Sequence, residues 1–352
     1  MKMTVQTGSY VRVLVVAIVA IAYSCGRQDN SASSSGEDLG ADSSVSQQVL
    51  QSNVQESLES LSEENSSASL NLDANPELEL ASGVSRSCVV ESQSAKVTIS
   101  SDISKDVTIS GRLRTIKRSL SGKGEQVRVW SRSGGSVDCA ASGKYAGIDW
   151  KNVDGLSLKV SFSRSRAASD SITNIKKGTT VSRSSAYDAS GTRAIAWSQG
   201  SADTSSSVVR NKVVTSSVVR SFSATKTSGE KIDLKLTTEI LAANPFKVTV
   251  TRASSDLSLQ SKLINSGTMI ATSKDGARVE SSFVALLINY KDGSCTPESG
   301  SIVSKFFAKD ATVASKTLQT SFENGVGTVT DENGQDSGSI EQNGCDPEDL
   351  GA

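Results

Sequence analysis

The stretch LSLKVSFS at residues 156–163 decides the fold class. Its first, third, fifth and seventh positions are apolar, and serine or lysine occupies the positions between them. Successive side chains of a β-strand point to opposite faces, so this alternation predicts a strand with one buried and one solvated face. A sheet that is solvated on one face is normally antiparallel. The stretch therefore predicts an antiparallel sheet.

The same two-residue period recurs toward the C-terminus, at residues 232–240 and 246–251. Residues 205–226 form an unusually long run of strand-forming residues, which predicts a bent strand or two strands in succession. Residues 278–290 are another long candidate. Their end, FVALLINY, is nearly continuous in apolar residues, which predicts burial on both faces.

Turn signals separate these runs, and helical patterns are scarce. Residues 253–264 favour a short helix, and residues 304–317 fit neither pattern clearly. We therefore predict a mostly β domain over residues 85–345, built as one large antiparallel sheet that is curved or folded as a sandwich, with an acidic tail at 346–352. The turn dipeptides are Ser228-Gly229, Asp275-Gly276, Asp292-Gly293, Asn324-Gly325 and Asn333-Gly334.

The composition excludes several classes of enzyme. The chain has 352 residues, of which 67 are serine and none is histidine. Without histidine there is no Ser-His-Asp or Cys-His catalysis, no histidine-ligated zinc and no ordinary proton shuttle at neutral pH. Catalysis by a pair of carboxylates or by a Ser-Lys dyad survives this exclusion.

Charge is distributed unevenly along the chain. Residues 26–84 hold 11 acidic groups and one basic group, and residues 331–352 hold 7 acidic groups and no basic one. The body between them, residues 85–330, holds 34 basic and 20 acidic groups, a balance of +14. A basic body favours anionic partners such as an anionic polymer, while acidic flanks compete for it. The other interpretation is that the charge serves solubility.

An export signal is predicted at the N-terminus. Residues 1–12 contain Lys2 and Arg12 and no acidic residue, and the apolar run VLVVAIVAIA follows at 13–22. Ten apolar residues are too few to span a membrane, which takes about 20, but they suit the hydrophobic region of a signal peptide. The run ends in AYSCG at 22–26.

Small residues before a cysteine at this position resemble the lipobox of bacterial lipoproteins. The resemblance covers residues 1–25 and no more of the chain. It implies that residues 1–24 are a signal peptide, that Cys25 receives a diacylglyceryl group and an acyl chain such as palmitate, and that the lipid anchors the protein in a membrane of the cell envelope. Gly26, after the cysteine, implies the outer membrane.

A polar segment separates the predicted lipid from the predicted sheet. Residues 25–84 are rich in serine and acidic residues, and most of them lack hydrophobic periodicity, so we predict a disordered tether. Residues 45–61 differ from the rest. Their apolar side chains recur every three or four residues, which predicts one short amphipathic helix. These side chains belong to Leu50, Val54, Leu58 and Leu61.

Four cysteines follow Cys25, namely Cys88, Cys139, Cys295 and Cys345. An even number of cysteines in an exported chain predicts disulfides, and four cysteines allow three connectivities. Pairing of nearest neighbours is our preferred connectivity. No pair has the C-x-x-C spacing, so neither a zinc ribbon nor a thioredoxin-type redox site is expected.

Three short patterns are candidates for chemistry or binding. Residues 223–226 and 228–231 match S-x-x-K, a motif of serine acyl-enzymes, but chance matches are expected in so serine-rich a chain. Residues 331–336 are rich in oxygen ligands but lack the glycine of a calcium loop, so a polar turn is expected and no metal is assigned. No cofactor motif is present.

A candidate binding surface lies in the predicted strand around Trp130. Arg128, Trp130 and Arg132 share one strand face, and exposed arginines beside an indole stack on sugars or meet anionic surfaces. The other interpretation is a solvated sheet face on which Trp130 covers an edge. The leading hypothesis is thus a lipid-anchored protein with a non-catalytic structural or binding role at the cell envelope. The alternatives are a carrier of a lipid or other hydrophobic ligand in a curved-sheet cavity, and a hydrolase without histidine. No specific recognition of nucleic acid is expected.

Overall fold

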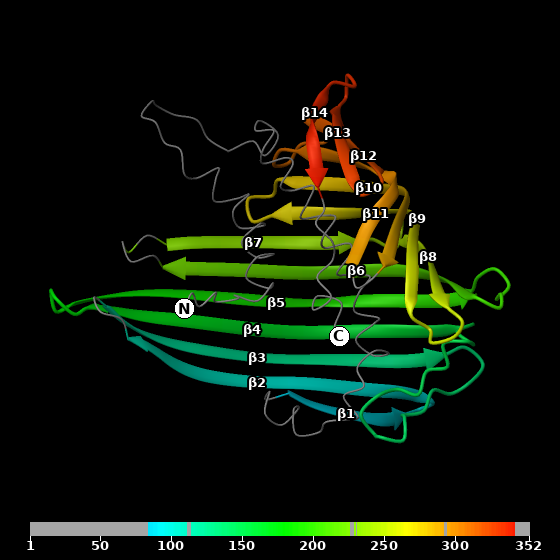
Figure 1. The fold of residues 1–352 in the computed structure, drawn as a ribbon, viewed down its shortest axis with the longest axis horizontal. Helices are drawn as coiled ribbons and strands as arrows, with labels where there is room; N and C mark the ends of the chain where they lie inside the picture. Colours follow the sequence, from blue (N-terminus) through cyan, green and yellow to red (C-terminus); the bar gives the residue numbers. More distant parts are fainter. Residues whose placement is uncertain (1–83, 111–113, 226–228, 230, 292–293, 342–352) are drawn as a thin grey trace. The chain divides into compact units, whose positions relative to one another are not determined.

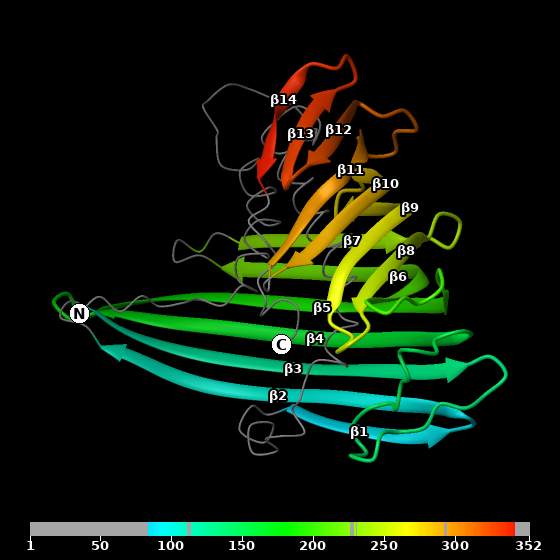
Figure 2. The same cartoon turned by 45° about the vertical axis from the view of Figure 1, so that its right-hand side comes forward.

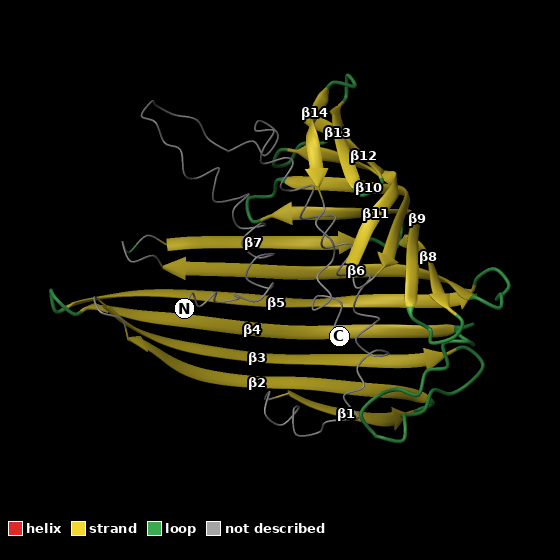
Figure 3. Ribbon diagram, viewed as in Figure 1, coloured by secondary structure: helices red, strands yellow, loops and turns green. Residues whose placement is uncertain are grey.

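The computed structural model describes residues 84–110, 114–225, 229, 231–291 and 294–341 (Figure 1). Within these residues it contains fourteen strands and no helix (Figure 3). All fourteen strands belong to one antiparallel sheet, which confirms the prediction of a mostly β protein with one large antiparallel sheet. The predicted tether and its helix at 45–61 lie outside the described residues.

The chain divides into two compact units. The first, which we call the long-strand unit, comprises residues 71–199 and 213–239. Its neighbouring strands are also neighbours in the sequence, as Figure 1 shows for the adjacent ribbons β2 to β5. The unit contains β1 (Val84–Glu91), β2 (Ser94–Ser110), β3 (Arg114–Arg132), β4 (Leu156–Asn174), β5 (Thr179–Gln199), the residues of β6 (Ser207–Thr225) from 213 onward and β7 (Lys231–Ile240) up to residue 239.

Strands β2 to β5 are long and pair without a register shift. They hold 17, 19, 19 and 21 residues, and β2 and β3 bow along their length (Figure 2). Because directly opposed residues of an antiparallel pair share a face, an unbroken register sorts every side chain onto one of two faces. The arginine face carries the even residues of β3 and β4 and the odd residues of β2 and β5. The hydroxyl face carries the others.

The apolar core of the long-strand unit lies at one end of the arginine face. All three tryptophans of the chain meet there. The rings of Trp130 and Trp197 stack with centroids 5.4 Å apart, and Trp150 meets both edge-on at 6.0 and 6.1 Å. Trp150 belongs to the loop at 133–155, which a disulfide ties to β1. Stacked and edge-on indoles add attraction to the area they bury.

The second unit, which we call the C-terminal unit, comprises residues 200–212 and 240–341 of the described chain. One of its cores is the buried cluster of Val279, Phe306, Leu318 and Val329. The unit contains residues 207–212 of β6 with β8 (Phe246–Ala253), β9 (Leu259–Ser273), β10 (Arg278–Lys291), β11 (Ser294–Phe307), β12 (Lys316–Glu323), β13 (Val326–Asp331) and β14 (Asp336–Glu341).

Two local predictions in the C-terminal unit are wrong. The expected helix at 253–264 is instead a turn followed by β9, and Leu257 has a left-handed φ of 59° that a helix does not allow. The run FVALLINY in β10 is buried on one face only. Val284 is 52 % exposed, while Phe283 and Leu286 are each 1 % exposed. Ala285, with φ of 47°, lies in a β-bulge that breaks the alternation between them.

The turn predictions hold wherever the structure describes both residues. Asp275-Gly276 joins β9 to β10, Asn324-Gly325 joins β12 to β13, and Asn333-Gly334 joins β13 to β14. Each of these glycines has a positive φ, a conformation that glycine adopts without steric cost. The ambiguous stretch at 304–317 ends β11, forms a loop and begins β12.

Candidate binding surface on the hydroxyl face

Serine and threonine dominate the hydroxyl face. Across β2 to β5 this face has eight complete rows of four residues, of which the row of Lys96 carries no hydroxyl and the other seven run from the row of Thr98 to the row of Ser110. Of the 28 positions in these seven rows, 19 carry serine or threonine. Large apolar side chains are almost absent from these rows, with Val127 the largest. The face therefore exposes hydroxyl groups rather than a core-forming surface.

The sheet geometry makes this face a regular array. Neighbouring strands lie about 4.8 Å apart and alternate residues along a strand about 6.8 Å apart, so the 28 positions cover about 900 Å². Neighbouring side chains contact each other: Thr173 and Thr180 hydrogen-bond through their hydroxyls at 3.0 Å, and Ser119 donates to Asp106 at 2.6 Å. Each hydroxyl can both donate and accept a hydrogen bond, so every serine and threonine of the array offers a donor and an acceptor.

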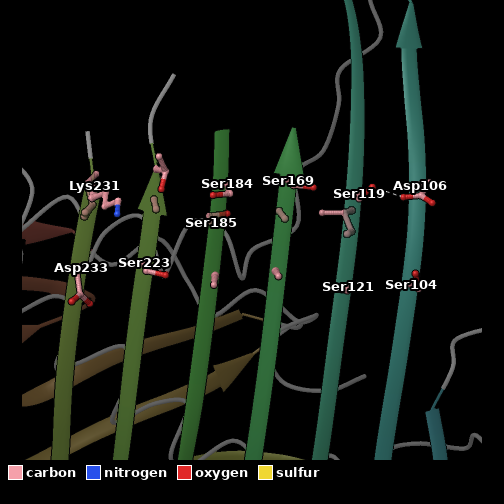
Figure 4. A pocket seen from close by; sticks show the side chains of 17 residues that line it. Ser104, Asp106, Ser119, Ser121, Ser169, Ser184, Ser185, Ser223, Lys231 and Asp233 are labelled. Atoms are coloured by element: carbon pink, nitrogen blue, oxygen red, sulfur yellow. Dashed lines mark hydrogen bonds between the residues drawn. The ribbon is translucent and has the colours of Figure 1, made fainter. Parts of the chain in front are cut away.

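A hollow of about 790 Å³ crosses the long-strand unit from β2 to β7 (Figure 4). Two rows of the hydroxyl face contribute to its lining. The first row holds Ser104, Ser121, Ala167 and Ala186, and the second holds Asp106, Ser119, Ser169 and Ser184. From the last two strands come Ser223, Lys231 and Asp233. Hydroxyls, two carboxylates and one amine thus surround a space in which the side chains are mostly short.

On the arginine face, one carboxylate is held by two guanidinium groups. Arg118 donates to both oxygens of Asp170 at 2.6 and 2.9 Å, and Arg183 donates to one of them at 2.7 Å. The Asp170 side chain is only 7 % exposed. The hydrogen bonds from Arg118 are the main cause that lowers the Asp170 pKa to about 2, with Arg183 contributing and burial opposing.

The surface predicted around Trp130 is not exposed as expected. Arg128, Trp130 and Arg132 do share one face, which belongs to the arginine face. Trp130 is only 2 % exposed and Arg128 only 8 %. Arg132 donates to the backbone oxygen of Asn152 at 2.6 Å. The expected exposure is therefore wrong, because the tryptophan packs in the core; a role of these residues in binding stays a prediction.

One of the two preferred disulfides is confirmed. Cys88 of β1 and Cys139 of the loop at 133–155 are bonded. Cys25 and Cys345 lie outside the described residues, and Cys295 is described only as a backbone position of β11. Lipidation of Cys25 and the second disulfide therefore stay predictions.

The other sequence patterns have partial outcomes. Ser223 and Lys231, one from each S-x-x-K match, line the same hollow, whereas Lys226 and Ser228 lie outside the described residues. Asp331 accepts hydrogen bonds from two backbone nitrogens of its own loop, as a polar turn does. Among the described residues, no group of three His, Cys, Asp or Glu side chains is placed to hold a metal ion.

The hydroxyl face does have a signal in the sequence, although no hydrophobic alternation marks it. Serine or threonine occupies six of the seven odd positions from 161 to 173. Such a polar run lacks the apolar partner positions by which half-buried strands are normally recognised. Alternation of serine with arginine is a strand pattern too, and it continues β4 well past the apolar stretch at 156–163.

Comparison with known proteins supplies no relative from which a function could be transferred. No family model matches the chain, and neither a curated protein nor a solved structure matches it. No helix of the described residues is long and apolar enough to cross a membrane. A function for this chain is therefore inferred from the chemistry of the described faces and from the N-terminal sequence.

Proposed function

We propose that this chain is a lipid-anchored protein of the bacterial cell envelope whose hydroxyl face binds a hydroxyl-rich glycan polymer. The observation that carries the binding role is the array of 19 serine and threonine residues at 28 positions, joined to an open hollow. The lipobox resemblance supports the anchor at Cys25 and the outer membrane as its location. The polar composition of residues 25–84 supports a tether, and the apolar spacing at 45–61 supports a short helix within it.

A glycan suits such an array because both surfaces carry groups that donate and accept hydrogen bonds. Each hydrogen bond exchanged with water contributes only about 0.5–1.5 kcal/mol, so one sugar binds weakly. A polymer that contacts many hydroxyls of the array binds more tightly, since each further contact forms within an existing complex. The paired strands already hold the hydroxyls in place, which lowers the entropic cost of ordering them on binding.

The hollow distinguishes this proposal from the carrier alternative. A carrier of a hydrophobic ligand needs an enclosed, mostly apolar lining. The hollow on β2 to β7 is open to solvent, and its lining mixes serine hydroxyls, two carboxylates and a lysine with alanines, Leu120 and Ile232. An open, mixed lining favours a polymer that lies along the face over an enclosed hydrophobic ligand.

A hydrolase without histidine is the second candidate, because one hollow collects groups that this chemistry uses. Asp106 and Asp233 are carboxylates, and Ser223 and Lys231 are a hydroxyl and an amine. Asp106 of β2 and Asp233 of β7 are five strand spacings apart, about 24 Å in a flat sheet, whereas the carboxyl groups of a glycosidase pair lie about 5–9.5 Å apart. The hydrolase candidate therefore reduces to a Ser-Lys dyad of Ser223 and Lys231. Turnover of an ester substrate, abolished in Ser223→Ala and in Lys231→Met, is the result expected of a hydrolase; an unchanged ester supports the binding role.

The binding role is tested by co-sedimentation with peptidoglycan sacculi and with chitin, two insoluble glycans. We expect retention of the exported chain and at least a tenfold loss in the double variant Ser121→Arg/Ser169→Arg, which places two long side chains in the hollow. The matched control is Ser321→Arg, at an exposed position of β12. Equal retention of the folded double variant, or no retention of the parent chain on either glycan, would overturn the proposal.

The anchor is tested by metabolic labelling in a bacterial host. Labelled palmitate should enter the parent chain and be lost in Cys25→Ser. Equal labelling of both chains would refute lipidation at this residue without touching the binding role.

A further inference from the structure

The two faces of β2 to β5 differ sharply in charge. Over eight rows, from Ala95 to Ser110 of β2, the hydroxyl face carries four lysines and four acidic residues. Over the same rows the arginine face carries six arginines, Lys105 and one acid, Asp170, a balance of +6. The arginines are Arg118, Arg128, Arg164, Arg166, Arg183 and Arg193. The basic character of these strands is thus confined to one face.

Apolar side chains lie among these arginines. Leu120 and Val181 are exposed large hydrophobic residues of this face, and the guanidinium of Arg164 lies 5.7 Å from the ring centroid of Phe162. Exposed apolar groups between cations fit an occupant that is itself both acidic and apolar. A purely polar anion would leave the apolar part of this face in water.

We propose that residues 45–64 of this chain dock on the arginine face of the long-strand unit. This segment precedes the described residues, contains no basic residue and combines four acids with an apolar periodicity of three and four. The acids are Glu56, Glu59, Glu63 and Glu64, and the apolar residues of the repeat are Leu50, Val54, Leu58 and Leu61. Its charge and its apolar spacing therefore complement those of the face.

The dimensions allow this docking. As a helix, 20 residues would be about 30 Å long and about 10 Å wide. Strand β2, with 17 residues, is about 55 Å long, and four strands are about 19 Å wide. The 19 residues from 65 to 83 reach up to about 60 Å, and they lead into Val84 at the start of β1, which pairs with β2. The segment can therefore reach any part of the face.

The contact should be reversible and sensitive to salt. A tethered segment meets its site at an effective concentration in the millimolar range, which favours docking even when each contact is weak. The arginines at 118, 164, 166 and 183 are half-buried or exposed, and those at 118 and 183 also hold Asp170, so ion pairs that they form with the segment are screened by salt. This inference concerns the face opposite to the proposed glycan site, and the two are independent.

Hydrogen exchange of the full exported chain, carrying Cys25→Ala, tests the docking. At about 50 mM salt, we expect amides of residues 45–64 to exchange at least tenfold more slowly than in the isolated peptide. About 0.5 M salt, which shortens the Debye length, should reduce this protection. The variant Arg164→Glu/Arg166→Glu should abolish it. The matched control is Lys117→Glu/Lys123→Glu. It makes the same charge change at two positions of β3 on the hydroxyl face, and it should keep the protection.

A charge swap keeps the test decisive if the arginine variant folds poorly. The variant Glu56→Lys/Glu59→Lys changes no residue of the described strands and should also lose the protection, and combining it with Arg164→Glu/Arg166→Glu should restore it. Peptide-like exchange in the parent chain would overturn the proposal, as would protection that survives the arginine variant. Arginine-dependent retention on phosphatidylglycerol vesicles, with residues 45–64 unprotected, would assign the face to an external anionic amphiphile instead.

Discussion

Replacing Asp170 by asparagine removes the charge that holds Arg118 and Arg183 together. The carboxylate is nearly buried and accepts three hydrogen bonds from the two guanidinium groups. In Asp170→Asn the two cations remain close without their shared anion. We expect a loss of folding stability that depends on pH in a defined way.

The magnitude follows from the Asp170 pKa, which falls from the ordinary value of 3.8 to about 2. At about 1.4 kcal/mol per pKa unit, ionisation contributes about 2 kcal/mol at pH 7. Solvent reduces this value, because the side chains of Arg118 and Arg183 are 37 % and 49 % exposed, so about 1–2 kcal/mol is expected. Since the folded-state pKa is the lower one, the contribution is complete above about pH 5 and is lost as the pH falls through about 2.

The assay is urea unfolding followed by far-ultraviolet circular dichroism at pH 7, 5, 3 and 2. Asp170→Asn should lower the free energy of unfolding by about 1–2 kcal/mol at pH 7, and its difference from the parent should shrink toward pH 2. The matched control is Asp188→Asn, an exposed carboxylate on the hydroxyl face of β5. A loss below about 0.5 kcal/mol at pH 7, or one that stays constant down to pH 2, would refute the reasoning.

Three further predictions concern the packing of the long-strand unit. The disulfide closes a loop with a sequence separation of 51, so Cys88→Ala/Cys139→Ala should lower the free energy of unfolding by about 3–4 kcal/mol, which thermal unfolding measures. Gly191→Ala should cost about 1–3 kcal/mol, because its Cβ would lie 2.5 Å from a backbone oxygen of β6; Gly122→Ala, with contacts at 3.5 Å, is the control in urea unfolding. Trp197→Leu should weaken the near-ultraviolet dichroism of the stacked indoles, and an unchanged spectrum would contradict the stacking.

The sequence predicts the strands well where apolar and polar residues alternate, as at 156–163. It predicts them poorly where one face carries arginine and the other serine, because both residue types are polar and the two-residue period is then invisible on a hydrophobicity scale. The stretch SRSR at residues 163–166 of β4 is of this kind. From residue 165 onward β4 pairs with residues of β3 that lie more than 40 positions earlier in the chain, so its register depends on distant sequence.

The candidate site escaped prediction for a related reason. The hydroxyl face exists only once four strands align, so no single segment contains it. Conversely, the arginines around Trp130 have the composition of a binding surface, but Trp130 packs against two indoles that follow later in the chain. Bulges such as that at Ala285 are similarly set by the partner strand and not by the local pattern.

Because all three tryptophans contact each other, tryptophan fluorescence reports on a single location in the protein. Every indole belongs to the long-strand unit, so tryptophan emission reports on this unit, whereas Tyr290 lies in the C-terminal unit and is not excited when tryptophan is excited selectively. Circular dichroism, in contrast, averages over the strands of both. Recording the two signals in one urea titration therefore distinguishes the unfolding of the two units without any label. Coincident unfolding curves mean that the units unfold cooperatively. Displaced curves mean that one unit unfolds at a lower urea concentration than the other.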